Sequence, residues 1–365
     1  MTTKRIPVSL YFVPEWWDRH YHSAAERPAR RSQTALESMY TGRQRFLYER
    51  FGDFGIGQAQ PVLGGQLSTV IRCGFDLVPV LLGTQVEMRD AWGFYPRARR
   101  LRDLDGLPPV DIARHPEGEW IARQKTLLGA LYGAVTHNVD IGSVTNNAFR
   151  IIGEELYAAL LCDRERVCEL FEVIIATEQS LHKLLSELFA PIDPVPISNC
   201  NAHMMGPGLY QTCVLEFDAR QNRFAEALTG ARPRANVHHC DVVADQFVHV
   251  YARLPGVATL QASLKSDIAM AKATLPASGF SAMIGPAAMK EAPSILQQSI
   301  ERALHAGADD LPVWNIDAAL DVSRVRDMLA VIRAACRAAD AEAQVTAMPL
   351  CWDELEWAHA RYANP

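Results

Sequence analysis

Two side chains that can bind a metal stand close together in the second half of the sequence: His238 and Cys240. Residues 235–239 have the composition of a β-strand, and side chains alternate between the two faces of a strand. His238 and Cys240 are therefore expected to point the same way, and His239 the other way. An imidazole nitrogen and a thiolate on one face can bind the same zinc ion. A buried cysteine beside two ordinary histidines would give the same pattern.

A catalytic zinc needs three protein ligands and one open position, so a third ligand must come from elsewhere in the chain. Cys351 follows the last predicted strand, at 344–348. In a closed barrel the first and last strands are neighbours and all strand ends open on one rim, so Cys351 can approach the pair. The predicted metal ligands are thus His238, Cys240 and Cys351, with Cys200 as the alternative third ligand.

Polar side chains at other predicted strand ends are candidates for binding the substrate: Asn146, Asn199, Asn201 and Asp267. Asn199 and Asn201 flank Cys200 and can hydrogen-bond a carboxylate or an amide. Asn146 stands where a helix is predicted to begin, and helix N-termini favour anionic groups. Two alternatives stay open, because Thr145 or Asn146 can simply cap that helix and Asp267 can cap the next one along the chain.

The elements that position these residues alternate between short apolar strands and longer amphipathic helices. Strands are predicted at 75–82, 138–144, 195–198, 235–239, 257–260, 280–284, 311–314 and 344–348. Helices are predicted at 120–133, 150–161, 164–189, 209–228, 242–253, 288–306 and 322–339. This alternation implies an α/β fold with a parallel sheet. It favours a closed (β/α)8 TIM barrel over residues 56–365, preceded by an N-terminal helical arm over 1–55. A doubly wound open sheet is the alternative.

The composition is that of a globular enzyme. The chain has 365 residues, of which 49% are hydrophobic and 21% charged, and its net charge is -6. There is no basic field of the kind that nucleic acid or an anionic membrane requires, and no apolar run is long enough to span a bilayer. Eight cysteines without a CxxC pair indicate reduced thiols. A cytoplasmic protein is expected.

Several segments, taken in order and spacing over roughly residues 50–365, resemble the uroporphyrinogen decarboxylase superfamily. They are the glycine-rich loop 51–57, the block 142–156 with Gly-Glu-Glu-Leu at 153–156, the junction 199–210, the His-His-Cys run 238–240, the segment 267–272 and the turn 284–286. The resemblance is closest to the corrinoid-linked zinc thiol methyltransferase branch. It implies a (β/α)8 barrel with its site at the C-terminal rim, and a homodimer.

That branch has an H-x-C…C zinc set, whose first two positions match His238 and Cys240. Cys351 matches the third by its place after a last strand, although it is preceded by Leu350 where the family usually has glycine. The decarboxylase branch grips its porphyrin with an arginine- and glycine-rich N-terminal segment. This chain lacks that segment, since its run at 27–31 has no glycine, so a porphyrinogen decarboxylase is not expected.

The resemblance thus implies a zinc-dependent methyl (or other alkyl) transferase. His238 and Cys240 would be catalytic as zinc ligands. A zinc-bound thiolate would attack a methyl group, as from methylcobalamin on a partner corrinoid protein, since no cobalamin-binding domain is visible in this chain. The alternative is a metal-independent decarboxylase or lyase acting on a small carboxylated substrate. A third hypothesis is a non-enzymatic barrel that binds a corrinoid protein.

Overall fold

The computed structural model describes residues 4–21, 33–64, 67–71, 77–88, 94–137, 142–188, 195–230 and 234–348. The chain divides into two compact units, each described here by itself. Unit 1 comprises Met1–Gly65, Asp241–Asp245 and Gln261–Asn364, and unit 2 comprises Gln66–Cys240 and Gln246–Leu260. Strand β8 (Val257–Ser263) begins in unit 2 and ends in unit 1.

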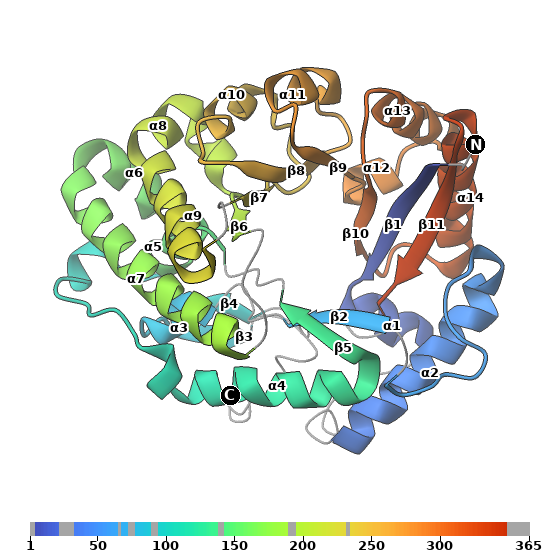
Figure 1. The fold of residues 1–365 in the computed structure, drawn as a ribbon, viewed down its shortest axis with the longest axis horizontal. Coiled ribbons are helices and arrows are strands. Elements are labelled where there is room, and N and C mark those ends of the chain that lie inside the picture. The colour runs from blue at the N-terminus through green and yellow to red at the C-terminus, as the bar shows by residue number, and fades with distance from the viewer. Residues whose placement is uncertain are drawn as a thin grey trace. The chain divides into compact units, whose positions relative to one another are not determined.

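Unit 1 is built around a strand from the start of the chain. Strand β1 (Lys4–Phe12) lies between β10 (Leu311–Ile316) and β11 (Ala341–Ala347) and runs parallel to both (Figure 1). Its even-numbered residues from Ile6 to Phe12 are buried, as the two-residue period of a strand requires. The strands that open and close the described part of the chain are therefore neighbours.

This strand corrects the prediction of a purely helical N-terminal arm. Helices α1 (Pro14–Tyr21) and α2 (Gln33–Phe51) do follow β1, but residues 4–12 belong to the sheet. Trp16 at the start of α1 is fully buried and donates a hydrogen bond to the backbone oxygen of Leu320. The first two elements therefore pack into unit 1 as part of its core.

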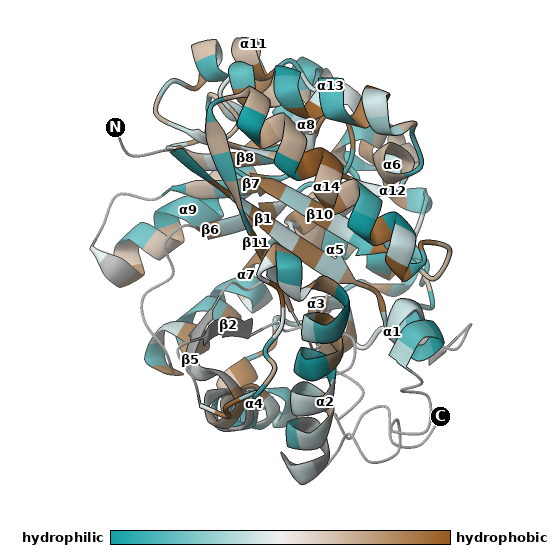
Figure 2. Cartoon of the chain, turned by 90° about the vertical axis from the view of Figure 1, so that its right-hand side faces the viewer, coloured by the Kyte–Doolittle hydropathy of each residue, from teal (hydrophilic) through white to brown (hydrophobic). Residues whose placement is uncertain are grey.

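The rest of unit 1 repeats a strand followed by helices. Strand β9 (Gly279–Met283) is joined to β10 by parallel bridges, and the end of β8 lies beside it. The helices are α11 (Ile268–Thr274), α12 (Pro286–Met289), α13 (Pro293–His305) and α14 (Val322–Ala338). Figure 2 shows hydrophobic and hydrophilic residues alternating along α14, whose buried residues follow the helical period from Val325 to Cys336.

Unit 2 holds two parallel strand groups and most of the long helices. Its strands are β2 (Leu67–Ile71), β3 (Val86–Met88), β4 (Phe94–Pro96), β5 (Gly133–His137), β6 (Val195–Ser198) and β7 (Ala235–His238), together with the start of β8. Strands β2 and β5 are parallel, β3 and β4 form an antiparallel pair, and β6 and β7 are parallel, with β8 beside β7.

The helices of unit 2 separate these strands along the chain. They are α3 (Leu77–Leu81), α4 (Pro116–Tyr132), α5 (Val144–Ile152), α6 (Glu155–Cys162), α7 (Arg164–Leu188), α8 (Gly206–Cys213), α9 (Leu215–Thr229) and α10 (Val248–Tyr251). Among the described residues, no helix combines the length and the apolar character that crossing a membrane requires.

The α/β fold with parallel strands is confirmed, but two of the predicted strands are wrong. Residues 77–81 form α3, and the strand expected at 138–144 lies earlier, as β5 at 133–137. A continuous apolar run such as 77–82 has no period that separates a buried strand from a buried helix. Val144 already begins α5, while residues 138–141 lie outside the described part of the chain.

Candidate metal centre

The candidate site lies where two neighbouring strands of unit 2 end. In the parallel pair of β6 and β7, Ser198 lies opposite His238. The ladder extends by one more hydrogen bond, from the backbone N–H of Asn199 to the carbonyl oxygen of His238 at 2.7 Å. Cys200 and Cys240 therefore leave the sheet at the same edge, one from each strand.

Three possible ligand atoms meet at this edge. Nε2 of His238 lies 3.2 Å from Sγ of Cys240, which in turn lies 2.9 Å from Sγ of Cys200. All three atoms fall within 4.8 Å of one another, and the three residues are half-buried. With metal–ligand bonds of about 2.0–2.3 Å, a tetrahedral zinc would hold its ligand atoms roughly 3.5–3.8 Å apart. The Nε2–Sγ distance from His238 to Cys240 and the Sγ–Sγ distance from Cys240 to Cys200 are thus shorter than in a zinc site.

The backbone at Cys240 is unusual and brings its sulfur into the cluster. Strand β7 ends at His238, and Cys240 has φ 47° in the left-handed region, which non-glycine residues rarely adopt. Such a conformation costs about 1–3 kcal/mol and often marks a functional site. His238 and Cys240 nevertheless share one side of the chain, so the prediction that their side chains point the same way is confirmed.

His239, the first residue after β7, points to the opposite side, as predicted. It is fully buried, and its Nδ1 lies 2.9 Å from the hydroxyl of Tyr251, while its ring packs on Phe247 with centroids 4.9 Å apart. Burial, with the positive charges of His203 and His238, lowers the pKa of His239 to about 4. His239 is therefore neutral at physiological pH and belongs to the core beneath the cluster.

The donor set suits a soft or borderline divalent ion. Two thiolates and one imidazole are typical zinc ligands, and three ligands leave a fourth tetrahedral position open. An open position next to two thiolates can bind the sulfur of a substrate thiol and favour its deprotonation. The residues present therefore fit a catalytic zinc better than a closed structural one.

The structure brings the alternative third candidate ligand, Cys200, to His238 and Cys240. Cys351, the first choice, lies outside the described residues, whereas Cys200 lies in contact with Cys240. The polar residues around Cys200 are bonded within unit 2. Asn146 Oδ1 accepts a hydrogen bond from the backbone N–H of Asn201 at 3.2 Å, and Asn199 is fully buried.

The structure shows which residues cap the N-termini of α5 and α11. Ser143 caps α5, because its Oγ accepts from the backbone N–H of Asn146, so the prediction of Thr145 or Asn146 as the cap is wrong. Asp267, in unit 1, accepts a hydrogen bond from the backbone N–H of Met270 at 2.9 Å and caps α11.

Sequence reasoning missed the buried polar side chains that surround this edge. Glu178 of α7, Tyr210 of α8, Asp218 of α9 and Tyr251 of α10 are all at most 2% exposed. Each lies in a helix rather than at a strand end, and the search for polar residues at strand ends therefore did not include them. An acidic residue on the apolar face of a predicted helix is the one signal that could have found Glu178 and Asp218.

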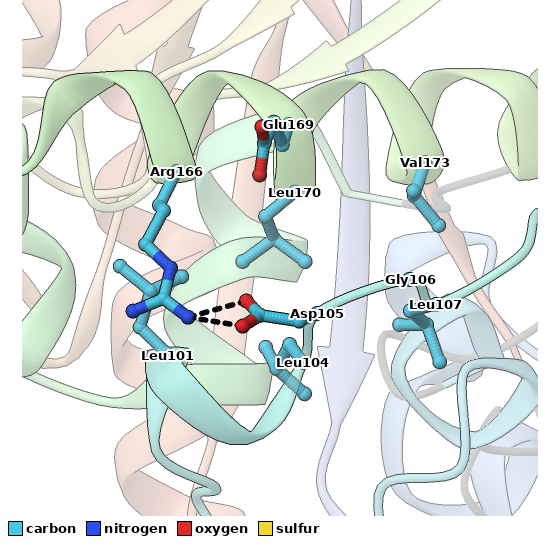
Figure 3. Close-up of a pocket in the computed structure, with 9 residues that line it drawn as sticks. All are labelled: Leu101, Leu104, Asp105, Gly106, Leu107, Arg166, Glu169, Leu170 and Val173. Carbon is cyan, nitrogen blue, oxygen red and sulfur yellow. Dashed lines mark hydrogen bonds and ion pairs between the residues drawn. The ribbon is translucent and has the colours of Figure 1, made fainter.

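A separate cavity of about 330 Å³ lies in unit 2 between α7 and the segment 101–107 (Figure 3). Its lining combines aliphatic side chains with an ion pair and a further carboxylate: Leu101, Leu104, Asp105, Gly106, Leu107, Arg166, Glu169, Leu170 and Val173. Arg166 donates to both carboxylate oxygens of Asp105 across the cavity mouth. None of the predicted site residues lines it.

Comparison with known proteins finds similarity in structure but not in sequence. No family model matches the chain, and no curated protein matches it in sequence. Among solved structures, the fold is similar to that of a methyltransferase from Methanosarcina mazei, with a TM-score of 0.61 and 11% identity. The match covers 91% of this chain and 94% of that one. The two proteins therefore share a fold over nearly their whole lengths.

Proposed function

We propose that this chain is a zinc-dependent methyl (or other alkyl) transferase that uses a small thiol as the acceptor. The cluster of Cys200, His238 and Cys240 carries this proposal, because it joins two sulfur atoms and one imidazole nitrogen within 4.8 Å. A fold similar to that of a solved methyltransferase supports the same reaction class.

We further propose that the fold is a closed (β/α)8 barrel of the uroporphyrinogen decarboxylase superfamily, with the metal site at its C-terminal rim. In unit 1, β9, β10, β1 and β11 follow one another through parallel pairs, so the first strand lies beside the last, as closure requires. In unit 2, Cys200 and Cys240 follow the C-terminal ends of β6 and β7, where a barrel enzyme carries its active site.

In this proposal Cys200, His238 and Cys240 hold the zinc, and Cys351 is the alternative third ligand. When bound, the zinc would lower the pKa of the acceptor thiol, so that a thiolate exists near neutral pH. Asn201 follows Cys200 directly and is half-buried, which makes its side chain our candidate for orienting the acceptor. Of the other predicted contacts, Asn146 and Asp267 accept backbone hydrogen bonds and Asn199 is fully buried.

The methyl donor would come from outside the chain, as methylcobalamin carried by a corrinoid protein. The thiolate sulfur would form a bond to the methyl carbon as the cobalt–carbon bond breaks, and the electron pair of that bond would stay on cobalt. The chain's own contribution is then to bind the acceptor, to hold its sulfur beside the incoming methyl group and to exclude water from the thiolate.

Free methylcobalamin with 2-mercaptoethanol tests this proposal, since loss of the cobalt–carbon absorbance reports the transfer. We expect the wild-type chain and Cys162→Ser, which changes an exposed cysteine, to accelerate the reaction, and Cys240→Ser to abolish the acceleration. Full activity in Cys240→Ser, or after chelation, would contradict the zinc mechanism. A purified chain that holds no metal and gives no methyl transfer would favour a metal-independent decarboxylase or lyase acting on a small carboxylated substrate.

A further inference from the structure

A buried polar cluster lies directly beneath the two segments that carry the candidate ligands. Asn199 of this cluster immediately precedes Cys200, and its backbone is hydrogen-bonded to His238. Tyr210 of α8 and Asp218 of α9 complete the cluster, and all three side chains are at most 1% exposed. Helix α9 packs beside β6 (Figure 1). Asn199 therefore links the ligand segments to helix α9.

The hydrogen bonds of the cluster fix the side chain of Asn199 in one orientation. Its Nδ2 donates to Oδ2 of Asp218 and lies close to the hydroxyl of Tyr210, both at 3.1 Å. On the other side, its Oδ1 accepts from the hydroxyl of Thr145 at 3.4 Å. The donor end thus faces helix α9 and the acceptor end faces helix α5, and a flipped amide would set its oxygen against the carboxylate of Asp218, which can only accept.

Asp218 is the acceptor on which this arrangement depends. Its Oδ2 also accepts a short hydrogen bond of 2.6 Å from Tyr210. Burial raises the pKa of Asp218 to about 6, against the effect of the hydrogen bonds from Tyr210 and Asn199. Near neutral pH the group is therefore a carboxylate, which can only accept, and hydrogen bonds to an ionised acceptor are the stronger ones.

We propose that Asp218 is a positioning residue for the metal centre, acting through Asn199 to hold Cys200 against His238 and Cys240. The inference rests on the proposed zinc site. Metal ligands are commonly oriented by a second layer of hydrogen-bonded groups, and loss of such a group typically lowers metal affinity by about 10–100-fold. Here the second layer acts on the backbone of the ligand segment, one residue away from the ligand.

Glu178 provides a comparison for a purely structural role of Asp218. Glu178 is a second buried carboxyl of unit 2, and it accepts hydrogen bonds from Asn147 and Gln221 rather than from a ligand segment. If Asp218 only fills the core, its replacement will lower stability as that of Glu178 does, and the metal site will stay unchanged. If Asp218 positions Cys200, only its replacement will alter the metal site.

Cobalt substitution distinguishes these cases, because the visible spectrum of cobalt reports the number and geometry of thiolate ligands. We expect Asp218→Asn to weaken zinc binding by about 10–100-fold, measured by chelator competition, and to alter the thiolate-to-cobalt charge-transfer band. An amide at position 218 keeps one acceptor oxygen for Asn199 and Tyr210 but loses the negative charge, so both hydrogen bonds become weaker. Glu178→Gln is the matched control and should keep the wild-type spectrum.

The exchanged pair provides a rescue. In Asn199→Asp with Asp218→Asn, donor and acceptor change places and a hydrogen bond to an ionised acceptor can form again, so affinity and spectrum should return toward the wild type. Asn199→Ala removes the link while leaving Asp218 bonded to Tyr210, and it keeps the test open if Asp218→Asn does not fold. Circular dichroism and thermal unfolding of the metal-free variants verify folding.

The outcomes separate this inference from the proposed function. A wild-type chain that binds neither zinc nor cobalt contradicts both. A wild-type chain that binds metal, with Asn199→Ala and Asp218→Asn indistinguishable from it, contradicts the positioning role alone. An equal spectral change in Glu178→Gln would do the same, because the effect would then belong to the core in general.

Discussion

The sulfur atoms of Cys200 and Cys240 lie 2.9 Å apart, although 40 positions separate the two residues in the chain. They meet because β6 and β7 are parallel neighbours and both cysteines follow the strand ends. The left-handed backbone of Cys240 completes the approach. The proposed zinc site depends on this relationship, since His238 and Cys240 alone are two ligands where a catalytic zinc needs three.

The third ligand can be identified by comparing two serine variants. We expect Cys200→Ser to weaken zinc binding by roughly a hundredfold or more, since loss of a direct ligand should exceed the effect of losing an outer-layer group. Cys351→Ser should retain zinc. Chelator competition measures both affinities. The opposite result, with zinc lost only in Cys351→Ser, would restore the ligand set predicted from the sequence.

The pH dependence of stability should report Glu178. Burial and the nearby charge of Asp218 raise the pKa of this group from 4.5 to about 8, against the hydrogen bonds from Asn147 and Gln221. The folded chain therefore keeps a proton that the unfolded chain loses near pH 4.5, so stability falls as the pH rises between these two values. Each unit by which the two pKa values differ is worth about 1.4 kcal/mol.

In Glu178→Gln the free energy of unfolding should therefore fall less steeply as the pH rises from about 5 to about 8. Urea titration at each pH measures this free energy. Part of the slope will remain, because the pKa of Asp218 is also raised, to about 6. Glu172→Gln on the same helix is the control. Arg220 lowers the pKa of Glu172, so its contribution is complete above the ordinary carboxyl range and its removal should leave the slope unchanged. Parallel curves for Glu178→Gln and the wild type would show that Glu178 ionises normally.

Strand β1 should be essential for folding, because it lies between β10 and β11. Leu10 is fully buried, and we expect Leu10→Ala to lower the free energy of unfolding by about 2–5 kcal/mol. Ser9→Ala, on the neighbouring and less buried position, should have a much smaller effect. Denaturant unfolding measures both. Equal stability of Leu10→Ala and the wild type would mean that β1 does not contribute to the core.

Much of the sheet could be predicted from the sequence, because its strands are short apolar runs bounded by turns. The six predicted strands from 195–198 onward all have counterparts among β6 to β11. Strand β1 was missed although Ile6, Val8 and Leu10 alternate as a strand requires, since the aromatic and charged residues around it favoured a helical arm. Residues 77–81 were misassigned because an apolar run without a period fits either element.

Part of the candidate site could also be predicted from the pattern of a strand. The two-residue period of a strand predicts His238 and Cys240 on one face and His239 on the other, and this outcome is correct although β7 ends at His238 and a left-handed backbone turns Cys240. The choice between Cys200 and Cys351 depends on which strands are neighbours, and a single sequence does not contain that information. The cluster of Asn199, Tyr210 and Asp218 could not be predicted from the sequence. Its three residues come from separate elements, and the sequence does not show that these elements pack against one another.

The helix cap of α14 offers a test of local structure. Asp321 accepts a hydrogen bond from the backbone N–H of Arg324 at 2.7 Å, as expected for an N-cap. Asp321→Ala should cost about 0.5–2 kcal/mol of stability, measured by thermal or denaturant unfolding. Asp327→Ala, an exposed change within the same helix, is the control. An equal effect of the two substitutions would argue against the cap.

The central claim is most directly tested by elemental analysis of the chain purified under reducing, chelator-free conditions. We predict about one zinc per chain in the wild type and in Cys162→Ser, and loss of the metal in both His238→Ala and Cys240→Ser. A wild-type chain without zinc, or zinc retained in both variants, would contradict the metal centre and the thiol chemistry derived from it.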